Sequence, residues 1–491
     1  MATETIEHFL DGLNLLVHPT KLKNTELQTL ENMEVRPTSV SDTLTYLALT
    51  ARNSYKRLHT DNLDFIAKNL IEFVQRVAGG SGTGSKFLVT GGYYSSNLVV
   101  KALLDAATTL TAVSTTASTD TGILSFLVFD QYLYYTDGNI AWRKWDGVTD
   151  AASSFVTKTK YGIKHKSRAF YANDVTNSLP NYLWVSDVGL PETVSASNFF
   201  VVGSQSDPII GLEDQIERIL IFKERSTWAF YLAPSLANST LLRADEFKGI
   251  IAPLGHLWAN QETYVQTSDA GLQKVKGLQY SPAVPQLWNF TKGFQNTLAA
   301  LGYREDQLLI STFSTSAQTR NNRVFAFDLI TDKLYQHNLS MSCFCSNRGI
   351  STFGKRAKAV EDDGTNRRIV EFDILTSVVE ATVTCKARTK DFTFGGLEHR
   401  ASLDGFAAEF SVPVTATVLT LKVYADGTLV ETKTFAPTAT GIQRHYFDLM
   451  LSLTSGYYHS FQLEYVQDAT LAAKFALHSA VVSYTVEERA E

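Results

Sequence analysis

Short apolar stretches separated by turn residues dominate the chain from about residue 86 onward. Residues 126–129, 132–135 and 140–145 are rich in branched and aromatic side chains, and Asp-Gly pairs begin at Asp137 and Asp146. Because Asp-Gly favours a tight hairpin turn, this pattern predicts an antiparallel ladder of strands. Similar ladders are predicted at residues 169–185, 216–231, 264–275, 307–335 and 357–372.

These ladders recur every roughly 40 to 50 residues, which is the period of β-propeller blades. No strict sequence motif repeats with them, so the predicted repeat is one of architecture. We therefore expect residues 86–377 to form a β-propeller of about five to seven blades.

The last part of the chain, residues 378–491, predicts a different all-β domain. Turn residues separate its apolar runs at intervals of about eight to twelve residues, as in an antiparallel β-sandwich. An Asp-Gly turn is expected at Asp426, and the domain boundary near residues 376–382. The strands are predicted at residues 406–414, 417–424, 429–435, 445–450, 457–466 and 475–486.

Only the N-terminal part predicts helix. A short helix is expected at residues 24–33, and an amphipathic helix at about 61–77, because six apolar residues there follow the three-and-four spacing of one helix face. These residues are Leu63, Ile66, Ala67, Leu70, Ile71 and Val74. The glycine-rich residues 79–85 would end that helix. The expected segments are an irregular lead-in belonging to the propeller (1–60), a helix with its connector (61–85), the propeller (86–377) and the sandwich (378–491).

Composition supports a folded, strand-rich protein. Of the 491 residues, 44% are hydrophobic and 19% charged, and Tyr (21) and Phe (29) are abundant, which suits packing on a pleated surface. The net charge is -6. The sequence contains no long basic stretch of the kind that binds nucleic-acid phosphates. The basic clusters at residues 164–166 and 321–323 are too short to predict nucleic-acid binding, and we expect them to be solvated turns.

The cysteines predict no disulfide framework. The chain has three, Cys343, Cys345 and Cys385, an odd number that favours assembly in a reducing cytosol. Cys343 and Cys345 would share one face of a strand, and His337 is the only histidine near them. Because this spacing matches no zinc motif, we expect buried thiols and no metal site.

No motif predicts catalysis or cofactor binding. The glycine-rich residues 79–85 lack the Gly-Lys-Ser/Thr ending of a phosphate-binding loop, and neither a nucleophile elbow nor a zinc-protease helix is present. His256 and His399 are expected to be structural, and residues 361–363 to form a turn before Gly364. A carboxylate pair brought together by folding, as in a propeller glycosidase, remains an alternative. We therefore predict no catalytic, cofactor-binding or metal-binding residue and no enzymatic activity.

The tryptophans are distributed along the predicted blades. Aromatic residues at strand spacing are expected to pack between blades, although exposed ones could form a platform for sugars. The tryptophans are Trp142, Trp145, Trp184, Trp228, Trp258 and Trp288.

Targeting and membrane signals are not expected. The start of the chain has no basic region before an apolar stretch, so it does not read as a signal peptide. Lys101, Asp105 and Asp120 interrupt the apolar residues 98–129. We therefore expect no membrane-spanning segment.

Several phrases resemble one protein family. Residues 11–14, with Leu22, Glu26, Leu30 and Asn32, are similar to a "GGLN" lead-in, although Asp11 stands where Gly is usual. The phrases that follow the same family pattern are residues 183–192, 207–212 with 220–228, 249–253 and 267–272. The family is the β-propeller proteins of the bacteriophage head-to-tail junction and tail, which includes packaged-DNA stabilisation proteins and tail nozzle or hub proteins.

The resemblance implies a structural protein of the virion, assembled in the host cytoplasm. Its copies would form an oligomeric ring at the head-to-tail junction or tail that extends or closes the DNA channel. The implied partners are other copies, the adaptor, portal, tail fibre or needle proteins, and DNA that passes without sequence-specific contact. The alternative is a receptor- or glycan-binding propeller at the tail tip.

Overall fold

The protein is all-β and divides into two compact units. Unit 1 comprises Met1–Lys56, Phe325–Asn338 and Asp373–Glu491, and unit 2 comprises Arg57–Val324 and Leu339–Phe372. The computed structural model describes residues 2–6, 13, 21–23, 27–41, 44–51, 54–76, 83–267, 271–284, 287, 297–304, 306–313, 318–345, 357–374, 383–393, 401–412, 418–448, 458, 460–469 and 476–486.

Unit 2 contains five successive four-stranded sheets, and in each the strand order follows the chain. All neighbouring strands of the second sheet, for example, pair antiparallel. The five sheets are β6 (Asn69–Arg76), β7 (Thr83–Tyr94), β8 (Asn97–Leu104) and β9 (Thr111–Ala117); β10 (Ser125–Phe129), β11 (Tyr132–Thr136), β12 (Arg143–Trp145) and β13 (Asp150–Ala152); β14 (Thr159–His165), β15 (Arg168–Asp174), β16 (Leu179–Val185) and β17 (Phe199–Val201); β18 (Ile209–Asp214), β19 (Ile219–Lys223), β20 (Thr227–Tyr231) and β21 (Thr240–Asp245); β22 (His256–Ala259), β23 (Glu262–Thr267), β24 (Gly271–Lys276) and β25 (Gln279–Pro282).

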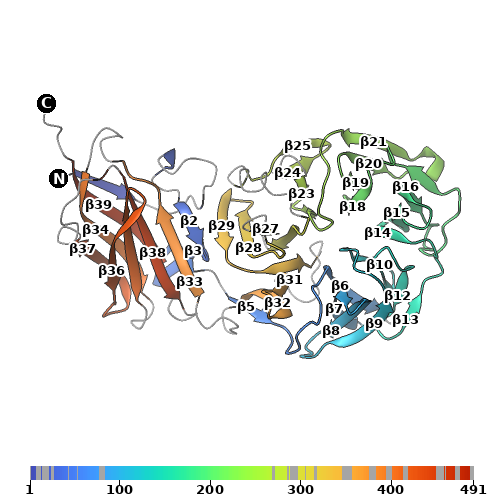
Figure 1. Cartoon of the computed structure of the whole chain (residues 1–491), viewed down its shortest axis with the longest axis horizontal. Helices are drawn as coiled ribbons and strands as arrows, with labels where there is room; N and C mark the ends of the chain where they lie inside the picture. Colours follow the sequence, from blue (N-terminus) through green and yellow to red (C-terminus); the bar gives the residue numbers. More distant parts are fainter. Residues whose placement is uncertain are drawn as a thin grey trace. The chain divides into compact units, whose positions relative to one another are not determined.

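Two further groups of strands complete this unit. β26 (Ala300–Arg304) and β27 (Gln307–Thr312) form an antiparallel hairpin. β30 (Met341–Phe344), β31 (Lys358–Asp362) and β32 (Arg367–Ile374) follow in one sheet, and the order of that sheet ends with the short strand β5 (Ser54–Arg57), of which Arg57 belongs to this unit. Figure 1 shows the sheets of this unit following one another around a ring, so the fold is β-propeller-like.

Local sequence explains the hairpins. The Asp137 carboxylate accepts hydrogen bonds from the backbone N–H groups of Asn139 (2.8 Å) and Ile140 (2.9 Å), and Gly138 has φ +86°. That turn reverses the chain after β11, because Gly reaches positive φ without strain. The strand ladders predicted from residue 126 to 372 are thus confirmed where the structure describes them.

Both helix predictions are wrong. Residues 27–31 form β2 (Leu27–Glu31), and residues 69–76 form β6. Residues 63, 65 and 67 are buried (at most 3% exposed) while Asp64 and Ile66 are exposed. Residues 61–68 form an irregular segment before β6. The three-and-four spacing arose because this segment buries every second residue and because β6 places Leu70 in one apolar cluster and Ile71 and Phe73 in another. In the described part of the chain no α-helix is present, and a 3-10 turn spans Leu236–Asn238.

The predicted glycine-rich connector is only partly described. Residues 79–82 lie outside the described residues, and Thr83, Gly84 and Ser85 already belong to β7. Among the described residues, no helix is long and apolar enough to cross a membrane.

Unit 1 contains two sheets that combine both ends of the chain. One has the order β3-β4-β39-β34-β37, with β1 also paired to β39; the other includes β2-β33-β38-β35-β36. The strands not yet given are β1 (Ala2–Ile6), β3 (Met33–Ser41), β4 (Leu44–Ala51), β28 (Arg323–Asp328), β29 (Lys333–His337), β33 (Val383–Thr389), β34 (Ala401–Val412), β35 (Leu419–Ala425), β36 (Thr428–Phe435), β37 (Gly441–Asp448), β38 (Phe461–Ala469) and β39 (Ala476–Val486).

Aromatic side chains pack the two sheets of unit 1 against each other. The Phe406 ring lies 5.5 Å from that of Tyr465, and Phe410 lies 5.9 Å from Phe435. Asp426 and Gly427 both have positive φ (46° and 78°) between β35 and β36, which confirms the predicted hairpin turn.

The lead-in is placed differently from the prediction. Residues 1–60 were expected to belong to the propeller, but Met1–Lys56 group with the C-terminal strands and only residues 57–60 belong to unit 2. The reason is strand pairing, since β1 pairs with β39 over five residue pairs and β4 also pairs with β39. Sequence patterns show that a strand exists but not which distant strand it joins.

Candidate functional site

A central cavity, called the channel below, is the first candidate site in unit 2. Its volume is about 680 Å³, and its lining includes residues of β6, β10, β14, β18, β22, β26 and β30, which are the first strands of the successive sheets and hairpins. Because each first strand faces the middle of the ring, the channel is formed by backbone topology and does not depend on any one loop.

Two histidine–carboxylate pairs flank β18 beside this channel. His256 Nδ1 lies 2.8 Å from Glu213 Oε2, and His165 Nδ1 lies 2.7 Å from Asp214 Oδ1. Successive residues of a strand point to opposite faces, so Glu213 and Asp214 reach the neighbouring first strands β22 and β14. His165 is 1% exposed, and within the described residues its buried Nε2 has no hydrogen-bond partner.

These pairs bear on two sequence predictions. The structural role expected for His256 fits its pairing with Glu213, whereas His399 lies outside the described residues. The prediction of a solvated turn at residues 164–166 is wrong for His165, which is buried at the end of β14. Lys166, with φ +53°, is in a turn. The acidic partner of His165 is 49 residues away, which is why the sequence did not reveal the pair.

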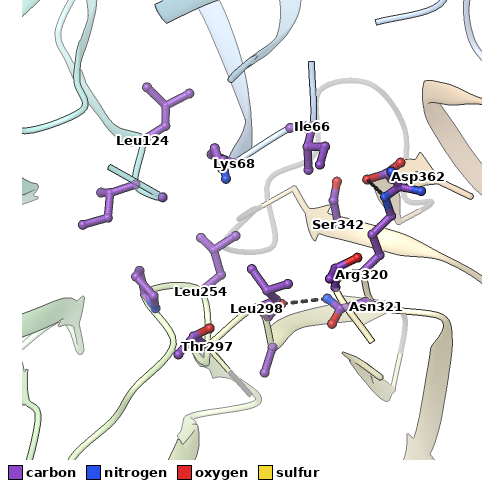
Figure 2. Close-up of a pocket in the computed structure, with 16 residues that line it drawn as sticks. Ile66, Lys68, Leu124, Leu254, Thr297, Leu298, Arg320, Asn321, Ser342 and Asp362 are labelled. Atoms are coloured by element: carbon purple, nitrogen blue, oxygen red, sulfur yellow. Dashed lines mark hydrogen bonds and ion pairs between the residues drawn. The ribbon is translucent and has the colours of Figure 1, made fainter. Parts of the chain in front are cut away.

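A smaller pocket lies beside the channel (Figure 2) and has a volume of about 60 Å³. Its residues come from the segments before β6, β10, β22 and β26, from residues 319–321 between β27 and β28, from β30 and from the end of β31. It shares Ile123, Leu124, Pro253 and Leu254 with the channel lining. Because four residues line both cavities, the smaller pocket lies next to the channel. We call it the side pocket.

One end of the side pocket is polar. Asp362 is 3% exposed, and its Oδ1 accepts a hydrogen bond from Arg367 Nε at 3.1 Å. Arg320 Nε lies 3.8 Å from Asp362 Oδ2. Asn321 Nδ2 donates to the backbone oxygen of Leu298 at 2.7 Å (Figure 2). Asn321 is 4% exposed, so the prediction of a solvated turn at residues 321–323 is also wrong.

The acidic run before Gly364 is partly a turn. Asp363 accepts hydrogen bonds from the backbone N–H groups of Thr365 and Asn366, and Gly364 has φ +95°. These hydrogen bonds lower the pKa of Asp363, although burial opposes the shift. Glu361 and Asp362 differ from the prediction, because they are buried residues of β31.

The cysteines are free thiols, and Cys343 and Cys345 line one apolar cluster, as expected for two residues on one strand face. Burial raises the pKa of Cys343 and of Cys345 to about 12, so both remain protonated at neutral pH. In unit 1, His337 Nε2 lies 2.8 Å from Glu34 Oε1, and both side chains are 1% exposed. Cys385 is buried, and its thiol donates to the backbone oxygen of Asn32 at 3.3 Å.

The tryptophans that the structure describes include buried inter-sheet residues. Trp142 is 0% exposed and its ring lies 5.2 Å from that of Tyr171 in the next sheet. Trp145 packs on Phe73 and Phe87 of the preceding sheet. Trp258 lines the channel, and Trp288 lies outside the described residues.

Within the described residues, no group of three or more His, Cys, Asp or Glu side chains is arranged to hold a metal ion. The channel and side pocket combine apolar walls with paired charges, an arrangement that can bind a molecule and orient its polar groups.

The sequence matches no protein-family model, and a comparison with curated proteins finds no match. Among solved structures, the WD40 domain of Neurospora crassa Pan2 is 10% identical with a TM-score of 0.41, covering 66% of this chain and 97% of that one. U3-55K is 8% identical (TM-score 0.40; 65% and 98%), and the computationally designed Ika8 protein is 9% identical (TM-score 0.36; 65% and 100%). The class that the sheets define is a β-propeller-like all-β protein.

Proposed function

We propose that this protein is a non-enzymatic structural component of a tailed-phage virion whose copies form a ring at the head-to-tail junction or tail. In this proposal the successive sheets of unit 2 are the blades of a propeller of about five to seven blades, and unit 1 contains a β-sandwich. The ring extends or closes the DNA channel, next to partners such as adaptor, portal, fibre or needle proteins.

The observation that carries the proposal is where the family-like phrases lie. Residues 207–212 and 220–228 meet in one hydrogen-bonded cluster between the third and fourth sheets. Asp207 Oδ2 accepts from Ser226 Oγ at 2.6 Å, and Ser226 Oγ accepts from Trp228 Nε1 at 3.1 Å. Lys223, 0% exposed, donates to the backbone oxygen of Ser204 at 2.8 Å.

A second phrase, residues 183–192, forms another such junction. Glu192 accepts hydrogen bonds from Lys144 Nζ (2.7 Å), Tyr134 Oη (3.0 Å) and Ser154 Oγ (2.8 Å), all from the second sheet or the residues just after it. The phrases that resemble the phage family therefore join neighbouring sheets. That role suits a rigid element in a large assembly, in which function resides in whole surfaces.

Exposed apolar residues offer a surface for subunit contact. They lie on the outermost strands of the second, third and fourth sheets and on the segments beside them. They include Val148 (80% exposed), Val156 (75%), Val201 (48%), Leu242 (45%) and Phe247 (76%). A ring needs a heterologous interface, in which such a surface meets a different surface of the next copy.

The charge distribution is compatible with DNA that passes without being tightly bound. The net charge is -6, and basic residues such as Arg143 and Lys144 are paired with carboxylates. Binding through phosphate neutralisation requires many available cations.

The test is the mass of the full chain by native mass spectrometry, together with its presence in purified particles. We expect one closed oligomer, and a Val156→Ser/Phe247→Ser variant that stays folded but loses it. Ile216→Ser, which also changes an exposed apolar residue (66%), serves as the control and should keep the oligomer. A chain that is monomeric and absent from particles would contradict the proposal.

An aromatic cluster favours a second candidate, glycan binding at the tail tip. On the third sheet Tyr182 and Trp184 lie 4.9 Å and 5.3 Å from the ring of Phe199, which is 36% exposed. Partly exposed aromatic faces can stack on sugars. A glycan array probed with the full chain tests this candidate, and it predicts a signal that Trp184→Ala removes.

A further inference from the structure

The side pocket contains two buried polar atoms that do not satisfy each other. Within the described residues, Asp362 Oδ2 and Arg320 Nε are buried and neither has a hydrogen-bond partner. They lie 3.8 Å apart, which is too long for a hydrogen bond. A buried donor or acceptor without a partner is costly, so such a pair in a cavity marks a place for a third group.

One oxygen atom can satisfy both. It would accept from the Arg320 Nε–H and donate its own proton to Asp362 Oδ2. A hydroxyl is the smallest organic group that has both capacities. Figure 2 shows Arg320 and Asp362 together at one side of the pocket.

Charge disfavours ionic ligands at this position. Asp362 also accepts from Arg367 at 3.1 Å, so one carboxylate lies between two guanidinium groups. A carboxylate ligand would be repelled by the negative charge of Asp362. An ammonium ligand would be repelled by the positive charge of Arg320, and it could only donate hydrogen bonds. A neutral group avoids both conflicts.

Much of the remaining wall is apolar, although Lys68, which pairs with Asp120 at 3.4 Å, and Thr297 also line the pocket. Ile66, Leu124, Leu254 and Leu298 contribute to its wall, and Figure 2 shows the three leucines away from Asp362. Its volume of about 60 Å³ holds on the order of four water-sized groups. The space therefore suits a branched carbon skeleton of a few atoms.

We propose that the side pocket is a binding site for a small neutral alcohol, with the hydroxyl bridging Arg320 and Asp362 and the carbon skeleton contacting Leu124, Leu254 and Leu298. This site is independent of ring formation. Because the pocket shares Leu124 and Leu254 with the channel lining, the bound molecule lies beside the channel.

The test compares three probes of equal size on the full chain by saturation-transfer NMR titration: 2-methylpropan-1-ol, 2-methylpropanoate and 2-methylpropylammonium. We expect the alcohol to bind at least tenfold more tightly than either ion. Equal affinities, or no binding of the alcohol at concentrations up to the solubility limit, would overturn the proposal and leave water as the bridging group.

A matched pair of variants locates the site. Arg320→Met removes the Nε donor at similar length and should weaken the alcohol about tenfold. Arg243→Met changes an arginine whose side chain is 49% exposed, paired with Glu246, and should leave binding unchanged. Unchanged alcohol binding in Arg320→Met would contradict the assignment, and the three-probe comparison on the unaltered chain decides the question if that variant is unstable.

Discussion

Two junctions within unit 2 hold neighbouring sheets together by different chemistry. Between the second and third sheets, Trp142 and Phe155 pack on Tyr171, with ring centroids 5.2 Å and 4.5 Å away. At the junction between residues 57–63 and the strands β31 and β32, hydrogen bonds and an ion pair join residues about 300 positions apart, beside an apolar cluster that includes Leu63 and Ile369. We call the first the aromatic junction and the second the closing seam.

The closing seam is a series of hydrogen bonds. Arg57 forms a bidentate pair with Glu361 (2.8 Å and 3.0 Å). The Ile369 N–H donates to His59 Nε2 at 2.9 Å, and the Leu58 N–H donates to the Ile369 oxygen at 2.9 Å. The comparison teaches that the junction between consecutive sheets is dominated by aromatic burial. Residues brought from far along the chain add directional, charge-dependent bonds, which also set their register.

The largest effect is expected at the aromatic junction. Trp142→Ala would remove a fully buried ring and its Nε1 hydrogen bond to Thr159 (2.8 Å), lowering the free energy of unfolding by about 3 to 5 kcal/mol. Urea denaturation measures it. Trp142→Phe is the matched control and should lose less than half as much; an equal loss would show that the hydrogen bond dominates.

The second-largest loss of stability is expected from breaking the closing seam. Arg57→Ala leaves Glu361, whose side chain is 4% exposed, without its bidentate partner, so we expect a loss of about 3 kcal/mol. The control is Arg243→Ala, which removes an exposed pair and should cost less than about 0.5 kcal/mol. Similar urea midpoints for the two variants would mean that the seam contributes little.

Acid should weaken the closing seam through His59. Burial lowers the pKa of His59 to about 4 from 6.5, against the opposing effect of Asp61, while Arg368 and Lys101 add to the lowering. As pH falls from 6.5 toward 4, the unfolded chain gains a proton that the folded chain does not, so stability declines. We expect a loss of about 2 kcal/mol by pH 5 from this residue.

The His59→Gln variant provides the control for this pH dependence. Gln keeps a neutral acceptor for the Ile369 N–H but does not titrate. Its stability should fall less between pH 7 and pH 5 than that of the unaltered chain. Identical pH profiles would exclude His59 as the cause.

The smallest effect is expected from the polar contact at the aromatic junction. Burial disfavours ionised Glu192, but hydrogen bonds from Lys144, Ser154 and Tyr134 outweigh it and lower its pKa to about 2. Glu192→Gln should cost about 1 kcal/mol at pH 7, measured by urea denaturation. The difference should shrink as pH falls from 4.5 through 2, because Glu192 then becomes neutral. If Glu192→Gln lowered the free energy of unfolding by more than Arg57→Ala does, the polar contact at the aromatic junction would contribute more to stability than the closing seam, which contradicts the account.

The sequence predicted the aromatic junction far better than the closing seam. The ladders from residue 126 onward follow from local alternation and Asp-Gly turns, and Trp142 was expected between blades. The seam was missed because Arg57, His59 and Glu361 carry no local signal of their pairing, and Leu63 and Leu70 fitted a helical spacing. The channel and the Arg320–Asp362 pair were missed for the same reason, since their residues meet only when the ring of sheets forms.

The measurement that tests the proposed function most directly is a cryo-electron microscopy reconstruction of the complete phage particle to which the proposal assigns this chain. We predict density for several copies of both units in a closed ring around the tail axis, with the exposed residues near Val156 and Phe247 at the contact between copies. A particle in which this chain is absent, or is found only at the tips of fibres, would contradict the proposal.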